Sequence, residues 1–244
     1  GRDLDAATVA ILEAEAALAE NNLPLASEKA AAAVSLAPKS APALYMQGLV
    51  RMRCSDPAAA RSQWLSALES DSHFAPARLA LGEQALAAGD QAGAEQYVLA
   101  VVRDEPGNMQ ALTLFARVLT AQNRYPAAVL IARRAQALDS NSPVPHVLLG
   151  QIAMALHRPG EALIEYEQAI LADAHSKEAI DGLTALYATG TITRPMLAKI
   201  ERVAQSPPAS ATLMEIAGRL YAQHGWYEDA KRCLAATLRL DPQR

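Results

Sequence analysis

Apolar residues recur at helical spacing along this chain. In the stretch 42–53, Tyr45, Leu49 and Met52 stand at positions i, i+4 and i+7, which is one face of a helix. The pair Asp56-Pro57 predicts the start of the next helix, because aspartate caps a helix N-terminus and proline suits its first turn. Prolines stand at nearly the same phase at Pro24, Pro126 and Pro159. We therefore expect short helices in antiparallel pairs.

The pattern repeats with a period of 34 residues. One column on this period is alanine except at Met196: Ala26, Ala60, Ala94, Ala128, Ala162 and Ala230. Another holds small residues: Gly48, Gly82, Ala116, Gly150 and Gly218. Another mixes small with large residues: Ala30, Trp64, Val98, Ala132, Tyr166, Ile200 and Leu234. Small residues let the two helices of a pair approach closely, and the larger ones fill the gap between repeats.

These columns match the tetratricopeptide pattern, in which W-x2-L-G-x2-Y precedes A-x3-F, an alanine and a closing proline. The chain resembles a tetratricopeptide-repeat protein. The resemblance implies an all-α fold, a right-handed α-solenoid superhelix of antiparallel helix pairs. It also implies an N-terminal extension, 1–6, and a single repeat domain, 7–244, with seven repeats at 7–40, 41–74, 75–108, 109–142, 143–176, 177–210 and 211–244.

Composition agrees with a helical fold. Alanine makes up 54 of the 244 residues and aromatic residues only 5%. Alanine favours helices, whereas strands favour the β-branched and aromatic residues that are scarce here. An all-β or doubly wound α/β fold is therefore not expected.

No pattern in the chain indicates catalysis. It has no phosphate loop, GxGxxG, GxSxG or HExxH motif, and its five histidines show no metal-ligand spacing. Cys54 and Cys233 lie far apart and form no CxxC or Cys/His cluster, so we expect neither a disulfide nor a zinc site. We expect a protein that is not an enzyme and has no catalytic residues, cofactor or metal.

The formal net charge of −4, with no long basic tract, argues against nucleic acid as a partner. No apolar run approaches the roughly 18 residues that span a bilayer, so direct membrane insertion is not expected. The chain begins with Gly1 and has no initiator methionine, which we interpret as a processed or excised piece. Its compartment stays open between the cytoplasm and the periplasm.

The resemblance also implies where a partner would bind. In the family, the first helix of each repeat lines a concave groove. The corresponding positions here are Tyr45, Leu49, Met52, Leu79, Glu83, Leu86, Thr113, Arg117, Thr120, Val147, Gln151 and Met154. Leucine, methionine and tyrosine there can accept apolar side chains of a peptide, while Glu83, Arg117 and Gln151 fix its register. Alternatively, some of these positions contact the neighbouring repeat.

Two functions follow from this reading. The first is a non-enzymatic scaffold that binds a peptide or partner protein in the groove, as part of a bacterial assembly. The alternative is a regulatory or substrate-presenting segment of a larger enzyme or of an exopolysaccharide-export assembly. We also expect that uncapped terminal repeats can support self-association.

Overall fold

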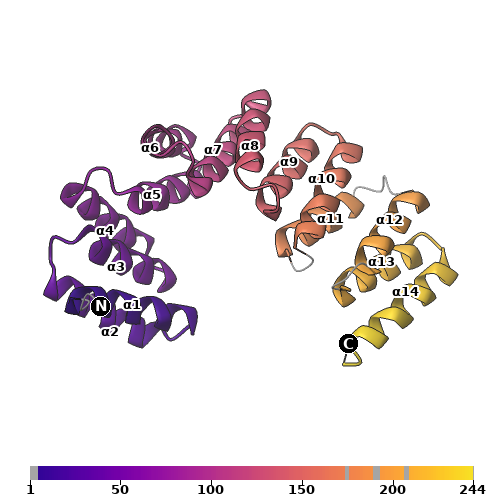
Figure 1. The fold of residues 1–244 in the computed structure, drawn as a ribbon, viewed down its shortest axis with the longest axis horizontal. Coiled ribbons are helices and arrows are strands. Elements are labelled where there is room, and N and C mark those ends of the chain that lie inside the picture. The colour runs from indigo at the N-terminus through magenta and orange to yellow at the C-terminus, as the bar shows by residue number, and fades with distance from the viewer. Residues whose placement is uncertain (1–4, 174–175, 189–192, 206–208, 244) are drawn as a thin grey trace. The chain divides into compact units, whose positions relative to one another are not determined.

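The computed structural model describes residues 5–173, 176–188, 193–205 and 209–243, without the side chains of Tyr187, Ala188, Met196 and Lys199. The described residues form helices joined by turns, and no strand occurs among them. They divide into two compact units, Gly1–Gln122 and Asn123–Arg244 (Figure 1).

The first unit contains seven helices. They are α1 (Ala6–Ala19), α2 (Leu23–Leu36), α3 (Ala41–Arg53), α4 (Pro57–Ser70), α5 (Ala75–Ala87), α6 (Gln91–Asp104) and α7 (Met109–Ala121). Consecutive helices pair as α1 with α2, α3 with α4, and α5 with α6. Each pair packs against the first helix of the next pair, which is the layered arrangement of a helical repeat.

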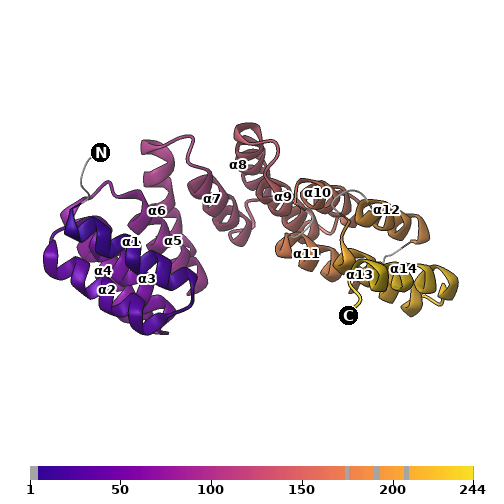
Figure 2. The same ribbon diagram turned by 60° about the horizontal axis from the view of Figure 1, so that its bottom comes forward.

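The described part of the second unit also contains seven helices. They are α8 (Tyr125–Leu138), α9 (Pro143–Ala155), α10 (Pro159–Ala172), α11 (Lys177–Ala188), α12 (Arg194–Gln205), α13 (Ala211–Gln223) and α14 (Tyr227–Leu240). Helix α9 pairs with α10, and α13 pairs with α14 (Figure 2). Helices α8 and α11 pack against the α9–α10 pair, α8 on α9 and α11 on both helices.

Side-chain caps and prolines start the helices where the sequence predicts. The Asp56 carboxylate accepts a hydrogen bond from the amide N–H of Ala59 at 3.0 Å, and Pro57 is the first residue of α4. Pro24, Pro126 and Pro159 all lie in the first turn of their helices, where a missing N–H leaves no hydrogen bond unmade. The predicted role of these prolines is confirmed.

Six of the described turns between consecutive helices share a backbone conformation that sequence reasoning did not find. Six residues at 34-residue spacing have a φ between 56° and 81°: Asn21, Ser55, Gly89, Asn123, His157 and Gly225. This left-handed conformation is free of strain for glycine and costs energy for other residues. Four of the six are glycine or asparagine, the residue types that adopt this conformation most readily, whereas Ser55 carries no such signal.

The alanine column lies in the core, as predicted. Five of its six alanines have no exposed surface and Ala230 is 4% exposed. The glycine column is packed as tightly: a Cβ on Gly150 would lie 2.6 Å from a ring carbon of Tyr166, and one on Gly218 would lie 2.8 Å from Leu234. A Cβ on Gly48 would overlap the indole of Trp64. Small residues thus stand opposite large ones at the helix crossings.

Tyr166 shows this complementarity most clearly. Its ring lies between Gly150 on α9 and Gly182 on α11, and a Cβ on either glycine would run into it. Its side chain is 2% exposed, and this burial raises the pKa of Tyr166 to about 12. One large side chain therefore joins two successive repeats.

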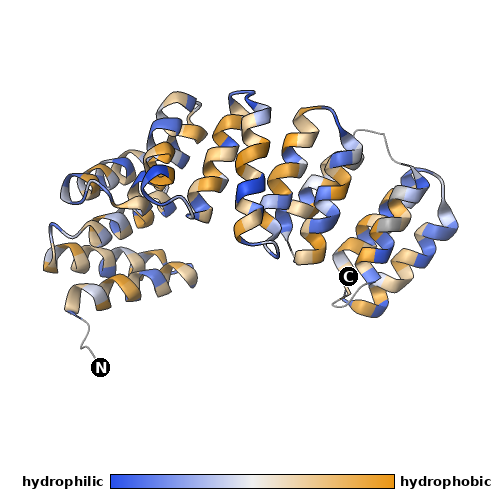
Figure 3. Cartoon of the chain, turned by 45° about the horizontal axis from the view of Figure 1, so that its top comes forward, coloured by the Kyte–Doolittle hydropathy of each residue, from blue (hydrophilic) through white to orange (hydrophobic). Residues whose placement is uncertain are grey.

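The chain is an all-α helical-repeat solenoid. Hydrophobic and hydrophilic residues alternate around its helices (Figure 3). Within the described ranges, no helix has the length and apolar character needed to cross a bilayer. The handedness of the superhelix, the N-terminal extension, the repeat limits and the single-domain organisation stay predictions.

Candidate binding surface

We call the first helix of each pair helix A and the second helix B. The A-helix surface of each unit comprises the side chains singled out from the sequence, which lie on α3, α5 and α7 in the first unit and on α9 in the second. On α3, Tyr45, Leu49 and Met52 are half-buried and pack against the core around Trp64. Tyr45 also meets the ring of Phe74 edge-on, with centroids 5.7 Å apart. These side chains are therefore held in place and only partly accessible.

Two of the predicted apolar residues are more deeply buried. Leu79 on α5 is 8% exposed and Val147 on α9 is 6% exposed. Leu86 is half-buried, as is Met154, which packs against the core of the second unit. Leu79 and Val147 are buried because they contact neighbouring helices, which is the alternative that the sequence left open for these positions. The accessible apolar area of the surface is thus smaller than the sequence suggests.

The three predicted polar residues are all exposed. Glu83 on α5 and Arg117 on α7 form an ion pair, Oε1 to Nη1, at 3.3 Å. The Glu83 side chain is 61% exposed and the Arg117 side chain 45% exposed, so the pair contributes at most about 1 kcal/mol to the stability of the fold. Gln151 is exposed on α9, in the other unit. A ligand could compete for the charges of Glu83 and Arg117 at little energetic cost.

Electrostatics link successive A helices of the first unit. Burial raises the pKa of the Tyr45 phenol, and the carboxylates of Glu83 on α5 and Glu15 on α1 raise it further. The phenol of α3 therefore lies within electrostatic reach of carboxylates on the A helices at either side. Glu15 was not among the predicted residues, although it occupies the same repeat position as Glu83.

The A-helix surface also holds a buried hydroxyl on α7. Thr113 lies one turn before Arg117, and its Oγ1 has no hydrogen-bond partner in the part of the chain that the structure describes. By contrast, the Thr120 hydroxyl donates to the carbonyl of Ala116 at 2.7 Å. An unpaired buried hydroxyl is destabilising by about 1–3 kcal/mol. Because this oxygen is buried, a ligand on the A-helix surface would not reach it.

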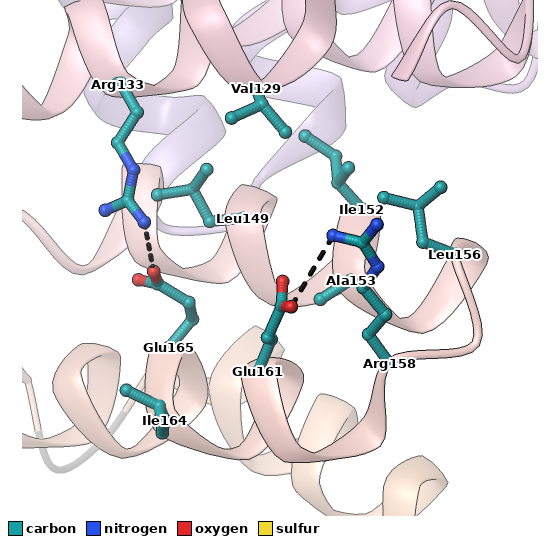
Figure 4. Close-up of a pocket in the computed structure, with 10 residues that line it drawn as sticks. All are labelled: Val129, Arg133, Leu149, Ile152, Ala153, Leu156, Arg158, Glu161, Ile164 and Glu165. Carbon is teal, nitrogen blue, oxygen red and sulfur yellow. Dashed lines mark hydrogen bonds and ion pairs between the residues drawn. The ribbon is translucent and has the colours of Figure 1, made fainter. Parts of the chain in front are cut away.

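A pocket of about 310 Å³ lies elsewhere, between helices α8, α9 and α10 (Figure 4). Its apolar lining comes from Val129, Leu149, Ile152, Ala153, Leu156 and Ile164. An ion pair stands on each side of this lining: Arg133 contacts Glu165 at 2.7 Å, and Arg158 contacts Glu161 at 3.5 Å (Figure 4). Sequence reasoning missed this pocket, because its lining is drawn from three helices at positions that each look ordinary.

Glu165 has a second partner at the pocket wall. Nδ1 of His146 lies 2.8 Å from its Oε2, and both side chains are nearly buried. Nε2 of His146 lies 3.1 Å from the amide nitrogen of Gln136 on α8. His146 thus connects all three helices and has a structural role.

A second charged cluster joins α12 to α14. Arg232 contacts both oxygens of Glu201 at 2.9 and 2.8 Å, and it also contacts Asp229 at 2.9 Å. Hydrogen bonds from Arg194, and then from Arg232, hold the pKa of Asp229 below its usual range, against the effect of burial. Burial, aided by Glu201, raises the pKa of the Cys233 thiol to about 11. The charged groups of this cluster are paired with one another, so the cluster stabilises the contact between successive repeats.

Comparison with known proteins identifies the repeat. A family model described as tetratricopeptide repeat matches residues 11–76, 45–108 and 79–143, which together cover more than half of the chain. A TPR repeat-containing protein of Treponema pallidum (strain Nichols) is 27% identical over 151 residues. That match covers 62% of this chain but 17% of the relative, so the chain spans about a sixth of the relative's length.

Solved structures share the fold at low sequence identity. A tetratricopeptide repeat protein from Parabacteroides merdae is 15% identical, with a TM-score of 0.63 over 96% of this chain and 93% of that one. Pseudomonas aeruginosa pilF is 16% identical, with a TM-score of 0.67 over 87% of this chain and 97% of that one. The family model matches more than half of the chain, and the helices pair with a period of 34 residues. The chain therefore belongs to the tetratricopeptide repeat family.

Proposed function

We propose that this chain is a non-enzymatic scaffold that binds a peptide or partner protein in a groove lined by its A helices. Tetratricopeptide folds generally mediate contacts between proteins and generally lack catalysis. The net charge of −4 favours a protein partner over nucleic acid.

The observation that carries the proposal is the continuity of polar groups across four A helices. Glu15, Tyr45, Glu83 and Arg117 come from α1, α3, α5 and α7. Glu83 and Arg117 form an ion pair, and the carboxylates of Glu15 and Glu83 are near enough to the Tyr45 phenol to raise its pKa. The charges of Glu83 and Arg117 are exposed and weakly paired, and the apolar side chains of α3 beside them are held in place. A ligand can therefore replace the contact between these two charges with contacts of its own.

The chemistry of this surface favours a particular class of peptide. Two carboxylates and a phenol outnumber the single guanidinium, so a basic side chain on the ligand gains attraction from Glu15 and Glu83. Half-buried Tyr45 and Leu49 supply the apolar contact. We therefore propose a peptide or protein segment that pairs a basic residue with an apolar one.

A charge exchange tests this without removing the native ion pair. The double variant Glu83→Arg/Arg117→Glu keeps opposite charges facing each other, so the fold should be retained, but it inverts the field that a ligand meets. We expect a partner captured by the wild-type chain to be lost or at least tenfold weaker with this variant. The measurement is affinity capture followed by titration of the recovered partner.

The matched control exchanges an ion pair of α1 and α2. Lys29 contacts Glu13 at 2.8 Å, and Glu13 lies off the A-helix surface. The variant Glu13→Lys/Lys29→Glu should bind the partner as the wild-type chain does. Equal affinity of all three proteins for every recovered partner would contradict the proposal.

The other readings from the sequence stay predictions. A segment of a larger enzyme or export assembly would be recognised from the complete reading frame. Self-association through the terminal repeats would be recognised by light scattering over a concentration series.

A further inference from the structure

The α8–α10 pocket has walls of opposite charge. The charged residue that lines it from α8 is Arg133, and those that line it from α10 are Glu161 and Glu165. Arg158, just before α10, also lines the pocket and contacts Glu161. The pocket is therefore an apolar cleft with a guanidinium on its α8 wall and two carboxylates on its α10 wall.

Apolar side chains remain accessible at the mouth of this cleft. Ile164 lines the pocket from α10 and is 52% exposed. Leu156, from the turn before α10, also lines the pocket. The volume of about 310 Å³ is at the lower end of the range for small-molecule sites, and it can take one bulky apolar side chain.

The ion pairs at the two sides of the pocket leave capacity for a partner. Arg133 uses Nη1 for Gln136 and Nη2 for Glu165, and a guanidinium has five N–H donors. The Arg158–Glu161 pair is long, at 3.5 Å, and both of its side chains are more than half exposed. Glu161 can therefore accept a basic group from outside at little cost.

The pocket is separate from the A-helix surface. On α9, Gln151 and Met154 belong to that surface, whereas Leu149, Ile152 and Ala153 line the pocket. At 3.6 residues per turn, the mean directions of these two sets differ by about 180°. Opposite faces of α9 therefore contribute to two different surfaces.

We propose that the α8–α10 pocket binds an amphipathic helix of a partner protein, which inserts one bulky apolar side chain. The acidic residues of the partner helix face α8, and the basic residues of that helix face α10. The charge pattern of the walls carries this assignment, because Arg133 on one wall and Glu161 and Glu165 on the other select a helix with complementary flanks. Apolar residues one turn from the anchor then cover Ile164.

Three synthetic helical peptides test the assignment. All three share the same Leu/Phe anchors at i, i+4 and i+7. One has glutamate on one flank and lysine on the other, one has glutamate on both flanks, and one has lysine on both. Fluorescence anisotropy should show the mixed peptide binding at least fivefold more tightly than either of the others. In methyl NMR spectra, Ile152 and Ile164 should shift when the mixed peptide is added.

Two variants with matched controls locate the site. Ile164→Ala should weaken binding of the mixed peptide at least fivefold, whereas Leu171→Ala, at a residue of equal exposure on the same helix, should not. Glu161→Lys should weaken the mixed and all-lysine peptides, whereas Glu178→Lys on α11 should leave both unchanged. Because Ile164, Leu171, Glu161 and Glu178 are all exposed, these variants are expected to fold.

Several results would overturn the proposal. They are equal affinity of the three peptides, no binding at millimolar peptide, or the same affinity in Ile164→Ala as in Leu171→Ala. Dimerisation of the wild-type chain that Ile164→Ala abolishes would show that the occupant is a second copy, which also overturns it. The exchange Glu83→Arg/Arg117→Glu should not change peptide binding, so this proposal and the proposed function fail independently.

Discussion

The substitution Gly150→Ala tests the packing that joins successive repeats. A Cβ at this position would stand 2.6 Å from Cε1 of Tyr166, whereas carbon atoms in contact lie about 3.5–4.0 Å apart. The ring would have to move by about 1 Å, and Gly182 on its other side leaves no room for that movement. The new methyl group therefore overpacks the α9–α10 crossing.

The expected magnitude is a balance of two effects. Overpacking a core is destabilising by about 1–3 kcal/mol. Replacing glycine by alanine within a helix stabilises by about 0.5–1 kcal/mol. The net result should be a loss of about 0.5–2 kcal/mol in the free energy of unfolding, measured by urea denaturation followed by circular dichroism.

Gly160→Ala is the matched control. Gly160 lies in α10, and a Cβ there would meet no atom within 4 Å, so this variant should be as stable as the wild-type chain or more stable. In a Tyr166→Leu background, Gly150→Ala should be less destabilising, because the ring that blocks the methyl group is gone. If Gly150→Ala behaves like Gly160→Ala, or if its effect is the same in both backgrounds, the reasoning is refuted.

Three further outcomes follow from the structure. Ala94→Leu should destabilise the chain by about 1–3 kcal/mol, because Ala94 has no exposed surface, whereas Ala92→Leu at an exposed position should change stability little in the same denaturation assay. Ser55→Gly should stabilise it by about 1 kcal/mol, because Ser55 has a φ of 61°; an unchanged midpoint would contradict this. A thiol reagent at pH 8 should label exposed Cys54 quickly and Cys233 only after unfolding, because burial and a pKa of about 11 leave about 0.1% of that thiol ionised.

The sequence predicted the helices and their crossings well, because both depend on local spacing. Asp56 caps α4 and Pro57 begins it through atoms within one turn of the chain. The period of 34 residues predicted a small residue at each helix crossing, and Gly48 lies at such a crossing, against the indole of Trp64. These features depend only on the register of the 34-residue repeat, and that register recurs along the chain.

The accessible surface was predicted less well. A small rotation of helix A decides whether a side chain faces solvent or a neighbouring helix, and Leu79 turned out 8% exposed while Glu83, one turn later, is open. The cluster of Glu201 and Arg232 joins residues 31 positions apart, and the period gives no signal for charge pairing between repeats. The α8–α10 pocket depends on side-chain shapes from three helices.

The most direct test of the central claim is hydrogen–deuterium exchange of the chain with and without its captured partner. If the A helices of the first unit form the binding groove, the partner should slow exchange in α3, α5 and α7. The B helices α4 and α6 of the same unit should exchange unchanged. Slowed exchange confined to α4 and α6, or no change anywhere in the first unit, would contradict the claim that this protein binds its partner through its A helices.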